Sequence, residues 1–216
     1  MTTIYPKECT CFMCKTKNTF HKLSSTNSFG SPDLDLRKPP MQRYTMEYWL
    51  EECPSCHYVA PSIEEPTKLR KDFIKSESYT NCSGIDFKSE LAQRFYRRYL
   101  IDAELGEFGN ACNDAIHAAW ACDDEGDTEN AKTCRILAAS LTKSLIRKDN
   151  EPTILLMRAD LLRRAEQFEQ LLKEYSNLQP FNDDLLDKIL AFQIKKAKEK
   201  DTKGYTVEQA INSEKE

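Results

Sequence analysis

Two pairs of cysteines constrain this chain more than any other feature of its sequence. Cys11 and Cys14 are separated by two residues, and Cys53 and Cys56 repeat that spacing later in the chain. Each pair places two thiolates on one tight turn, and two such turns facing each other provide the four sulfur ligands of a closed tetrahedral Zn²⁺ site. We therefore predict one structural zinc ion per chain, bound by these four cysteines.

One further cysteine leaves an alternative in this ligand set. Cys9 lies just before the first pair and is an alternative to Cys11. The spacing of Cys11 and Cys14 fits a metal-binding turn better, because two intervening residues direct both sulfur atoms inward. Four thiolates accept zinc or iron, so spacing alone does not choose between the two metals. A closed site has no coordination position for a substrate, so it explains folding and supplies no reaction.

The composition describes a globular protein without a membrane segment. The chain has 216 residues, of which 40% are hydrophobic and 31% are charged, and its formal net charge is −4. Its nine cysteines are an odd number, which favours a metal site over a set of disulfides. No apolar run is long enough to cross a bilayer and no leader peptide opens the chain, so we expect a cytoplasmic protein with no membrane partner.

Residues 1–66 are predicted to form a small, zinc-ribbon-like β head around the cysteine pairs. Residues 18–23 and residues 43–52 carry apolar side chains at alternate positions, which predicts one strand near each pair. Residues 1–10 are expected to be a short polar arm. Residues 24–40 are rich in Ser, Asn, Gly, Pro and Asp and predict an irregular loop, which either packs around the zinc or binds a partner.

Residues 67–200 are predicted to form an all-helical body, which makes the chain mainly α. Apolar residues recur every four positions from 87 to 104, and small residues line one face of 110–124, so these two segments form an antiparallel helical hairpin. Further helices are expected at the following residues: 127–147, 151–164, 167–177 and 183–200. Polar residues 201–216 are expected to be a frayed tail, although one docked turn there is an alternative.

The turns of this body have features of tetratricopeptide (TPR) repeats. Gly106 and Phe108 precede a run of alanines with the glycine, aromatic and small-residue spacing of a TPR turn, and Gly126 repeats the glycine. The interval from Gly106 to Gly126 is shorter than the period of about 34 residues in a regular array. We therefore expect a TPR-like body rather than a TPR array.

The second cysteine pair and its flanks resemble a bacterial family described only as a domain of unknown function, family 2225. The matching segments are 48–58, 32–35, 118–124 and 161–168. The resemblance covers nearly the whole chain and implies a cysteine-paired head joined to a TPR-like helical tail, with no known activity. His57 and Lys15 depart from the glycine that is usual after such a pair, so a positive φ at these positions would be strained.

The leading functional hypothesis is a non-enzymatic module that binds a protein or peptide partner through its helical-repeat surface. The candidate contact residues are Trp49, Arg97, Arg98, Arg163 and Arg164. The alternative for Trp49 is burial under the helical body, and the alternative for the arginines is a solvated or salt-bridged face.

Two other functional classes provide alternatives. A zinc ribbon with exposed aromatic residues can bind nucleic acid, but the head has nearly equal numbers of basic and acidic residues and lacks the positive charge that such binding requires. His117 with Asp123 or Asp124 is a candidate acid–base site of a hydrolase. The alternative for the two aspartates is capping of a helix end, where carboxylates accept from free N–H groups.

Overall fold

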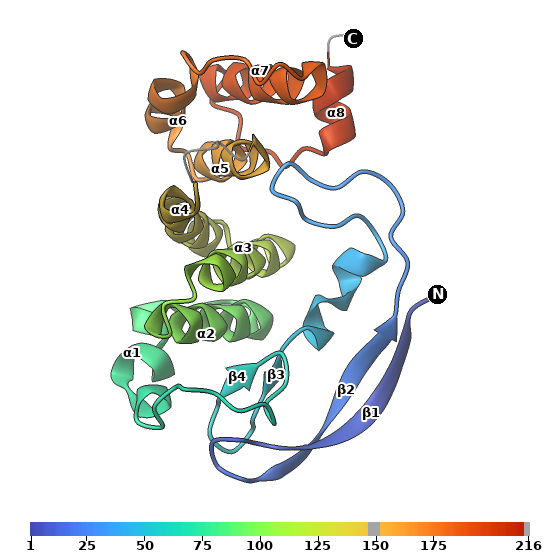
Figure 1. Cartoon of the computed structure of the whole chain (residues 1–216), viewed down its shortest axis with the longest axis vertical. Helices are drawn as coiled ribbons and strands as arrows, with labels where there is room; N and C mark the ends of the chain where they lie inside the picture. Colours follow the sequence, from blue (N-terminus) through green and yellow to red (C-terminus); the bar gives the residue numbers. More distant parts are fainter. Residues whose placement is uncertain (147–151, 214–216) are drawn as a thin grey trace.

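The computed structural model describes residues 1–146 and 152–213, and these residues are mainly helical. Helices α1 to α8 are stacked in one column, and the N-terminal part of the chain runs along one side of this column (Figure 1). The small sheets lie beside the lower end of the column, next to α1 and α2. The predicted fold class, a small β head followed by a helical body, is confirmed.

Two short antiparallel hairpins build the head. Strand β1 (Thr3–Thr10) pairs with β2 (Lys17–Ser25), and β3 (Glu51–Glu52) pairs with β4 (Val59–Ala60). The turn of each hairpin contains one cysteine pair. The two hairpins therefore bring the two pairs to the same end of the molecule.

Two sequence predictions for the head are wrong. Residues 1–10 contain strand β1 rather than a polar arm, because β1 pairs with β2 along its whole length. Residues 43–52 were expected to be one strand, but Gln42–Tyr48 form a 3₁₀ helix, η1, and within this range the strand β3 covers Glu51–Glu52 alone. Thr45, Met46 and Leu50 are buried while Tyr44 is exposed, so the buried positions follow a helical rather than an alternating spacing.

The helical part begins with short elements and continues with longer helices. Their bounds are η2 (Phe73–Lys75), α1 (Glu77–Thr80), η3 (Cys82–Gly84), α2 (Glu90–Glu104), α3 (Phe108–Asp124), α4 (Thr128–Leu145), α5 (Pro152–Arg164), α6 (Phe168–Tyr175), α7 (Asp184–Lys198) and α8 (Val207–Asn212). The six predicted helices from 87 onward correspond to α2 to α7, with shifted ends. The predicted end at residue 147 and start at residue 151 lie outside the described residues.

The same backbone turn ends four of these helices. Gly106, Gly126, Glu166 and Lys200 have φ values of 75°, 65°, 61° and 55°. In each case the N–H of the next residue donates to the carbonyl five residues earlier, at 2.8 or 2.9 Å. This is the hydrogen-bond pattern of a Schellman cap, in which a left-handed residue stops the helix. The recurrence explains why successive helices reverse direction and stack as a column.

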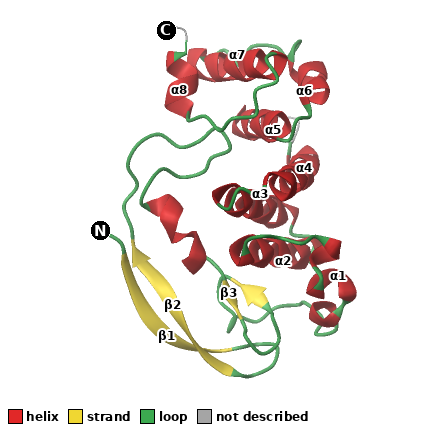
Figure 2. Ribbon diagram, turned by 180° about the vertical axis from the view of Figure 1, so that it is seen from behind, coloured by secondary structure: helices red, strands yellow, loops and turns green. Residues whose placement is uncertain are grey.

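The loop of residues 24–40 crosses to the far end of the helical column. The N–H of Leu34 donates to the carbonyl of Tyr205, and the N–H of Val207 donates to the carbonyl of Pro32, both at 2.9 Å. The view from behind shows this loop passing close to α5 and α8 (Figure 2). The loop therefore packs on the helical body rather than around the cysteine cluster.

The tail is more ordered than the sequence suggests. Residues 201–216 were expected to fray, but 207–212 form α8, and Ala210 is 2% exposed. Thr206 caps α8 and pairs with Asp33 of the crossing loop, which supplies the partner that the sequence does not reveal. One buried hydrophobic cluster extends from Cys9 in the head to Ala210 in the tail, so head and body share a core.

No helix within residues 1–146 and 152–213 combines the length and hydrophobicity needed to cross a membrane.

Candidate metal centre

The four predicted cysteines meet where the two hairpin turns face each other. The Sγ atoms of Cys11, Cys14, Cys53 and Cys56 all lie within 4.8 Å of one another. Across the two turns, the sulfurs of Cys11 and Cys56 are 3.7 Å apart, and those of Cys14 and Cys53 are 3.5 Å apart. A tetrahedral site with Zn–S bonds of about 2.3 Å needs sulfurs about 3.8 Å apart. The sulfur spacing therefore fits one metal ion at the centre.

The two cysteine turns have the same backbone hydrogen bonds. The N–H of Lys15 donates to the carbonyl of Cys11 at 2.9 Å, and the N–H of His57 donates to the carbonyl of Cys53 at 2.8 Å. Lys15 and His57 have φ values of 64° and 58°, so both occupy the left-handed region that favours glycine. Both residues therefore have the positive φ at which strain was expected, and the two turns share one backbone shape.

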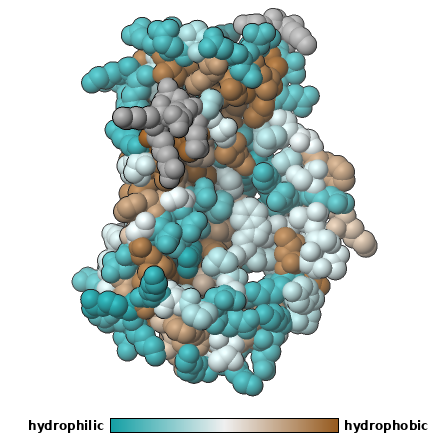
Figure 3. Space-filling model, viewed as in Figure 1, coloured by the Kyte–Doolittle hydropathy of each residue, from teal (hydrophilic) through white to brown (hydrophobic). Residues whose placement is uncertain are grey.

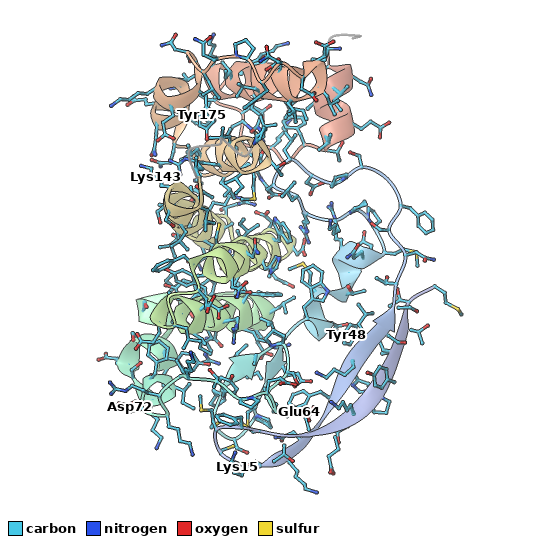
Figure 4. All side chains as sticks on the ribbon, viewed as in Figure 1. Lys15, Tyr48, Glu64, Asp72, Lys143 and Tyr175 are labelled. Carbon is cyan, nitrogen blue, oxygen red and sulfur yellow. The ribbon has the colours of Figure 1, made fainter. Side chains whose placement is uncertain are left out.

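The cluster lies near the surface at the lower end of the molecule, which Lys15 marks in Figure 4. Cys11 and Cys53 are buried, whereas Cys14 is exposed. Burial raises the pKa of Cys11. For Cys14 burial acts in the same direction, but hydrogen bonds with the hydroxyl and backbone of Thr16 outweigh it and lower the pKa to about 6. A thiol that ionises near neutral pH is suited to metal binding, since the thiolate is the ligand.

Cys9 lies outside this cluster. Its Sγ is 3.9 Å from a carboxylate oxygen of Glu51. Burial, and then the charge of Glu51, raise the pKa of Cys9, which keeps the thiol protonated. The structure therefore places Cys11, and not Cys9, in the set of four sulfurs.

Contacts from α1 and α2 attach the second cysteine turn to the helical column. The buried hydroxyl of Tyr79 donates to the carbonyl of His57 at 2.6 Å. Arg97 donates to the carboxylate of Glu52 at 2.6 Å, and Arg98 donates to the carbonyl of Val59 at 3.4 Å. These residues flank the cysteine pair on both sides, so the metal turn and the helices form one connected unit.

The four candidate partner-binding arginines are engaged inside the protein. Arg97 binds Glu52, and Arg98 binds the carboxylate of Asp102. Arg163 is fully buried and pairs with Asp160, while Arg164 donates to Asp35 at 2.8 Å and to Asp123 at 2.6 Å. The salt-bridged arrangement, which is the alternative stated for these arginines, therefore describes them better than a partner-binding face, because carboxylates of the protein itself hold the four side chains.

Trp49 is half-buried against the helical body. Its ring centroid is 6.4 Å from that of Phe95 and 5.1 Å from that of His117, both in edge-to-face contact. Its indole N–H donates to the hydroxyl of Thr45 at 2.9 Å. Burial under the body, the alternative stated for this residue, describes Trp49 better than a free partner-binding aromatic.

The candidate hydrolase residues do not form one site. His117 lies among the rings of Trp49, Phe95 and Trp120, and burial lowers its pKa to about 4. The carboxylate near its ring belongs to Asp114, at 3.8 Å. Asp123 is bound by Arg135 and Arg164, and Asp124 is bound by Arg37. The two aspartates act as ion-pair partners at the end of α3, so an acid–base pair with His117 has no geometric basis.

A buried polar cluster that the sequence does not reveal holds the crossing loop to the column. Asp35 is 1% exposed and accepts from the indole N–H of Trp120 and from Arg164, both at 2.8 Å. Burial acts to raise the pKa of Asp35, but Arg164 and Arg135 hold it below its usual value. Asp35 precedes Arg164 by most of the chain length, and no local pattern predicts their contact.

Comparison with known proteins finds no match to this chain. No family model, no curated protein and no solved structure matches the chain. The resemblance to family 2225 therefore stays a prediction from the sequence, and the four-cysteine cluster and its surroundings are the basis for a functional proposal.

Proposed function

We propose that this protein is a non-enzymatic interaction module, in which one structural zinc ion fixes the head and a partner protein binds to the surface formed by head and helices. The hydrogen bond from Tyr79 in α1 to His57, which directly follows Cys56, carries this proposal. It ties the four-sulfur cluster to the helical column, so a bound metal would stabilise the shape of both parts.

Zinc is the metal that the donor set favours. The ligand set contains four sulfurs, and its two buried members, Cys11 and Cys53, come from different hairpins. Zinc held by four thiolates contributes folding free energy and has no open position for substrate. The cysteines would hold the ion, while the N–H of the Asn18 side chain, 3.8 Å from the sulfur of Cys53, would stabilise negative charge on that thiolate.

The TPR-like column supports a partner-binding role, but its inner side is occupied by the chain itself. The crossing loop and η1 lie along that side (Figures 1 and 2). The lower part of the face in Figure 3, around the head, is mainly hydrophilic, whereas apolar surface gathers over the upper helices. A hydrophilic surface favours a partner that binds reversibly through polar contacts over a permanent apolar interface.

Nucleic-acid binding by the head has less support than protein binding. Trp49, the strongest stacking candidate, is engaged with Phe95 and His117. The charge of the head is close to neutral, and single-stranded nucleic acid requires a positively charged groove.

Affinity capture followed by reconstitution tests the proposed function. The zinc-loaded full-length protein is used to capture partners from a lysate, and each identified partner is purified and titrated by calorimetry. We expect one partner protein to bind with 1:1 stoichiometry and to bind less tightly after a chelator removes the zinc. Failure of every purified candidate to bind, or retention of nucleic acid at physiological salt, contradicts the proposal.

A further inference from the structure

Cys14 is the exposed member of the four-sulfur cluster. All nine cysteines lie in the part of the chain that the structure describes, and Cys14 alone among them is exposed. Cys11 and Cys53 are 0% exposed, and Cys56 is half-buried. A small oxidant dissolved in water therefore reaches the sulfur of Cys14 more readily than the sulfur of any other cysteine of this chain.

A second sulfur of the cluster lies close to Cys14, on the facing turn. The Sγ atoms of Cys14 and Cys53 are 3.5 Å apart, and these two residues come from different hairpins. The S–S bond of a disulfide is about 2.05 Å long, so the two sulfurs have to approach by about 1.5 Å. Rotation of the two side chains on their turns supplies a movement of this size. Cys53 is therefore placed to react with Cys14, although solvent does not reach Cys53 itself.

The five cysteines outside the cluster do not offer the same chemistry. Each of them is buried, and burial in apolar surroundings keeps a thiol unreactive. They are Cys9, Cys82, Cys112, Cys122 and Cys134. Oxidation should therefore begin at the cluster and not elsewhere in the chain.

Bound zinc would hold all four sulfurs as thiolates, and the thiolate is the form that an oxidant attacks. We propose that Cys14 is a modification site for hydrogen peroxide and that Cys14 and Cys53 then form a disulfide, which opens the metal centre. Hydrogen peroxide fits this role because it is small and uncharged and accepts two electrons from a pair of thiolates. The inference rests on the proposed function in one respect, namely that loss of zinc weakens binding of the partner.

The reaction has two balanced steps. The thiolate of Cys14 attacks one oxygen of hydrogen peroxide, so that an S–O bond forms, the O–O bond breaks, and hydroxide leaves and takes a proton from solvent. The thiolate of Cys53 then attacks the sulfur of the Cys14 sulfenic acid, so that the S–S bond forms and the S–O bond breaks. The second hydroxide also takes a proton and becomes water. The two sulfurs lose two electrons, and the peroxide gains them.

The disulfide dismantles the ligand set. Only Cys11 and Cys56 remain as thiolates, and two sulfurs do not complete a tetrahedral structural site. The second turn changes as well, because the carbonyl of Cys53 accepts from the N–H of His57 at 2.8 Å and the carbonyl of His57 accepts from Tyr79. Oxidation therefore releases the ion and loosens the contact between the second turn and α1.

The rate of zinc release measures this reaction. The zinc-loaded full-length protein is mixed with excess hydrogen peroxide and a chromogenic chelator that reports the free ion, and the rate without peroxide is subtracted. Cys14→His and Cys56→His are compared, because each leaves three cysteines and one histidine, a ligand set that structural zinc sites also use. Elemental analysis checks that each variant holds one zinc per chain before peroxide is added.

The two histidine variants differ in the exposed thiolate. We expect peroxide to release zinc from Cys14→His at least about tenfold more slowly than from Cys56→His, because only Cys56→His keeps the thiolate of Cys14. Cys112→Ala removes a buried cysteine of α3, outside the cluster, and should leave the release rate of the wild type unchanged.

Trapping with dimedone tests the wild-type protein directly and does not depend on the folding of any variant. Dimedone reacts with sulfenic acids, and peptide mass spectrometry locates the label. We expect the first label at Cys14 and the first disulfide between Cys14 and Cys53. A phosphine reductant with added zinc should restore the four-thiolate site, because a disulfide is reversible whereas sulfinic and sulfonic acids are not.

The outcomes separate this inference from the proposed function. Equal release rates of the two histidine variants, a first label on another cysteine, a different first disulfide, or zinc loss that the reductant does not reverse overturns the inference. If a chelator weakens partner binding but peroxide leaves the zinc in place, the proposed function stands and this inference fails. If peroxide releases the zinc as expected but no partner protein is found, the proposed function fails instead.

Discussion

Replacing Tyr79 with phenylalanine tests whether the metal turn and the helical column form one unit. The Tyr79 hydroxyl donates to the carbonyl of His57 at 2.6 Å, and Tyr79 is 0% exposed. The substitution removes one hydrogen bond with a net value of about 1 kcal/mol and leaves the carbonyl of His57 without this donor. We therefore expect the free energy of unfolding to fall by about 1 to 3 kcal/mol. Because His57 directly follows Cys56, we also expect the zinc dissociation constant to rise by about tenfold.

Tyr175 provides a matched control for this substitution. Its hydroxyl donates to the carbonyl of Leu155 at 3.0 Å, and Tyr175 is 3% exposed. Figure 4 places Tyr175 near α6, at the opposite end of the column from the metal turns. Tyr175→Phe should lower the free energy of unfolding by a similar amount and leave zinc affinity unchanged. Urea unfolding and competition with a chromogenic chelator measure the two quantities. Equal zinc affinities of the two variants would refute the coupling.

Three further predictions concern the turns, the buried carboxyl pair and the removal of metal. Gly106→Ala should lower the free energy of unfolding by about 1 to 2 kcal/mol; the cause is the φ of 75°, because no atom lies within 4 Å of an added Cβ and a clash is excluded. Glu166→Gly, at a φ of 61°, should raise the free energy of unfolding by about 0.5 to 1 kcal/mol. Urea unfolding that shows the reverse order contradicts the turn assignment. Asp102 has a raised pKa of about 7, so the folded state binds more protons than the unfolded state and the contribution of Asp102 to stability is lost as pH rises through this value. Wild type should lose about 1 kcal/mol more than Asp114→Asn between pH 6.5 and 8.5, because the hydrogen bond with Asp114 adds to burial in raising the pKa of Asp102. Equal losses argue against this hydrogen bond. Chelation of the zinc should broaden the NMR resonances of the head before those of α6 and α7; a uniform response indicates that the site does not organise the head.

The features predicted from sequence are those that local patterns determine. Two cysteines with two intervening residues specify a turn by themselves, so Cys11, Cys14, Cys53 and Cys56 could be identified without a structure. The four-residue period from 87 to 104 predicts α2 because one helix face is buried by neighbours that follow directly in the chain. In both cases the physical cause lies within a short segment.

The features missed from sequence depend on contacts between distant segments. Asp35 and Trp120 form a buried hydrogen bond, and α8 is ordered by the loop around Asp33. The sequence left open whether the candidate arginines bind a partner or form salt bridges, and the structure shows Arg163 buried in an ion pair with Asp160. The η1 segment was predicted as a strand from its alternate apolar residues, whereas the hydrogen bond from the Trp49 indole to Thr45 spans one helical turn.

X-ray absorption at the zinc edge of the purified full-length protein tests the central claim most directly. A closed structural site predicts four sulfur neighbours at about 2.3 Å, with no nitrogen or oxygen neighbour. Elemental analysis of the same sample should give one zinc per chain, and a Cys53→Ser/Cys56→Ser variant should lose it. A spectrum with three or fewer sulfurs and an oxygen or nitrogen neighbour would contradict the account, because an open coordination position would make the metal available for chemistry.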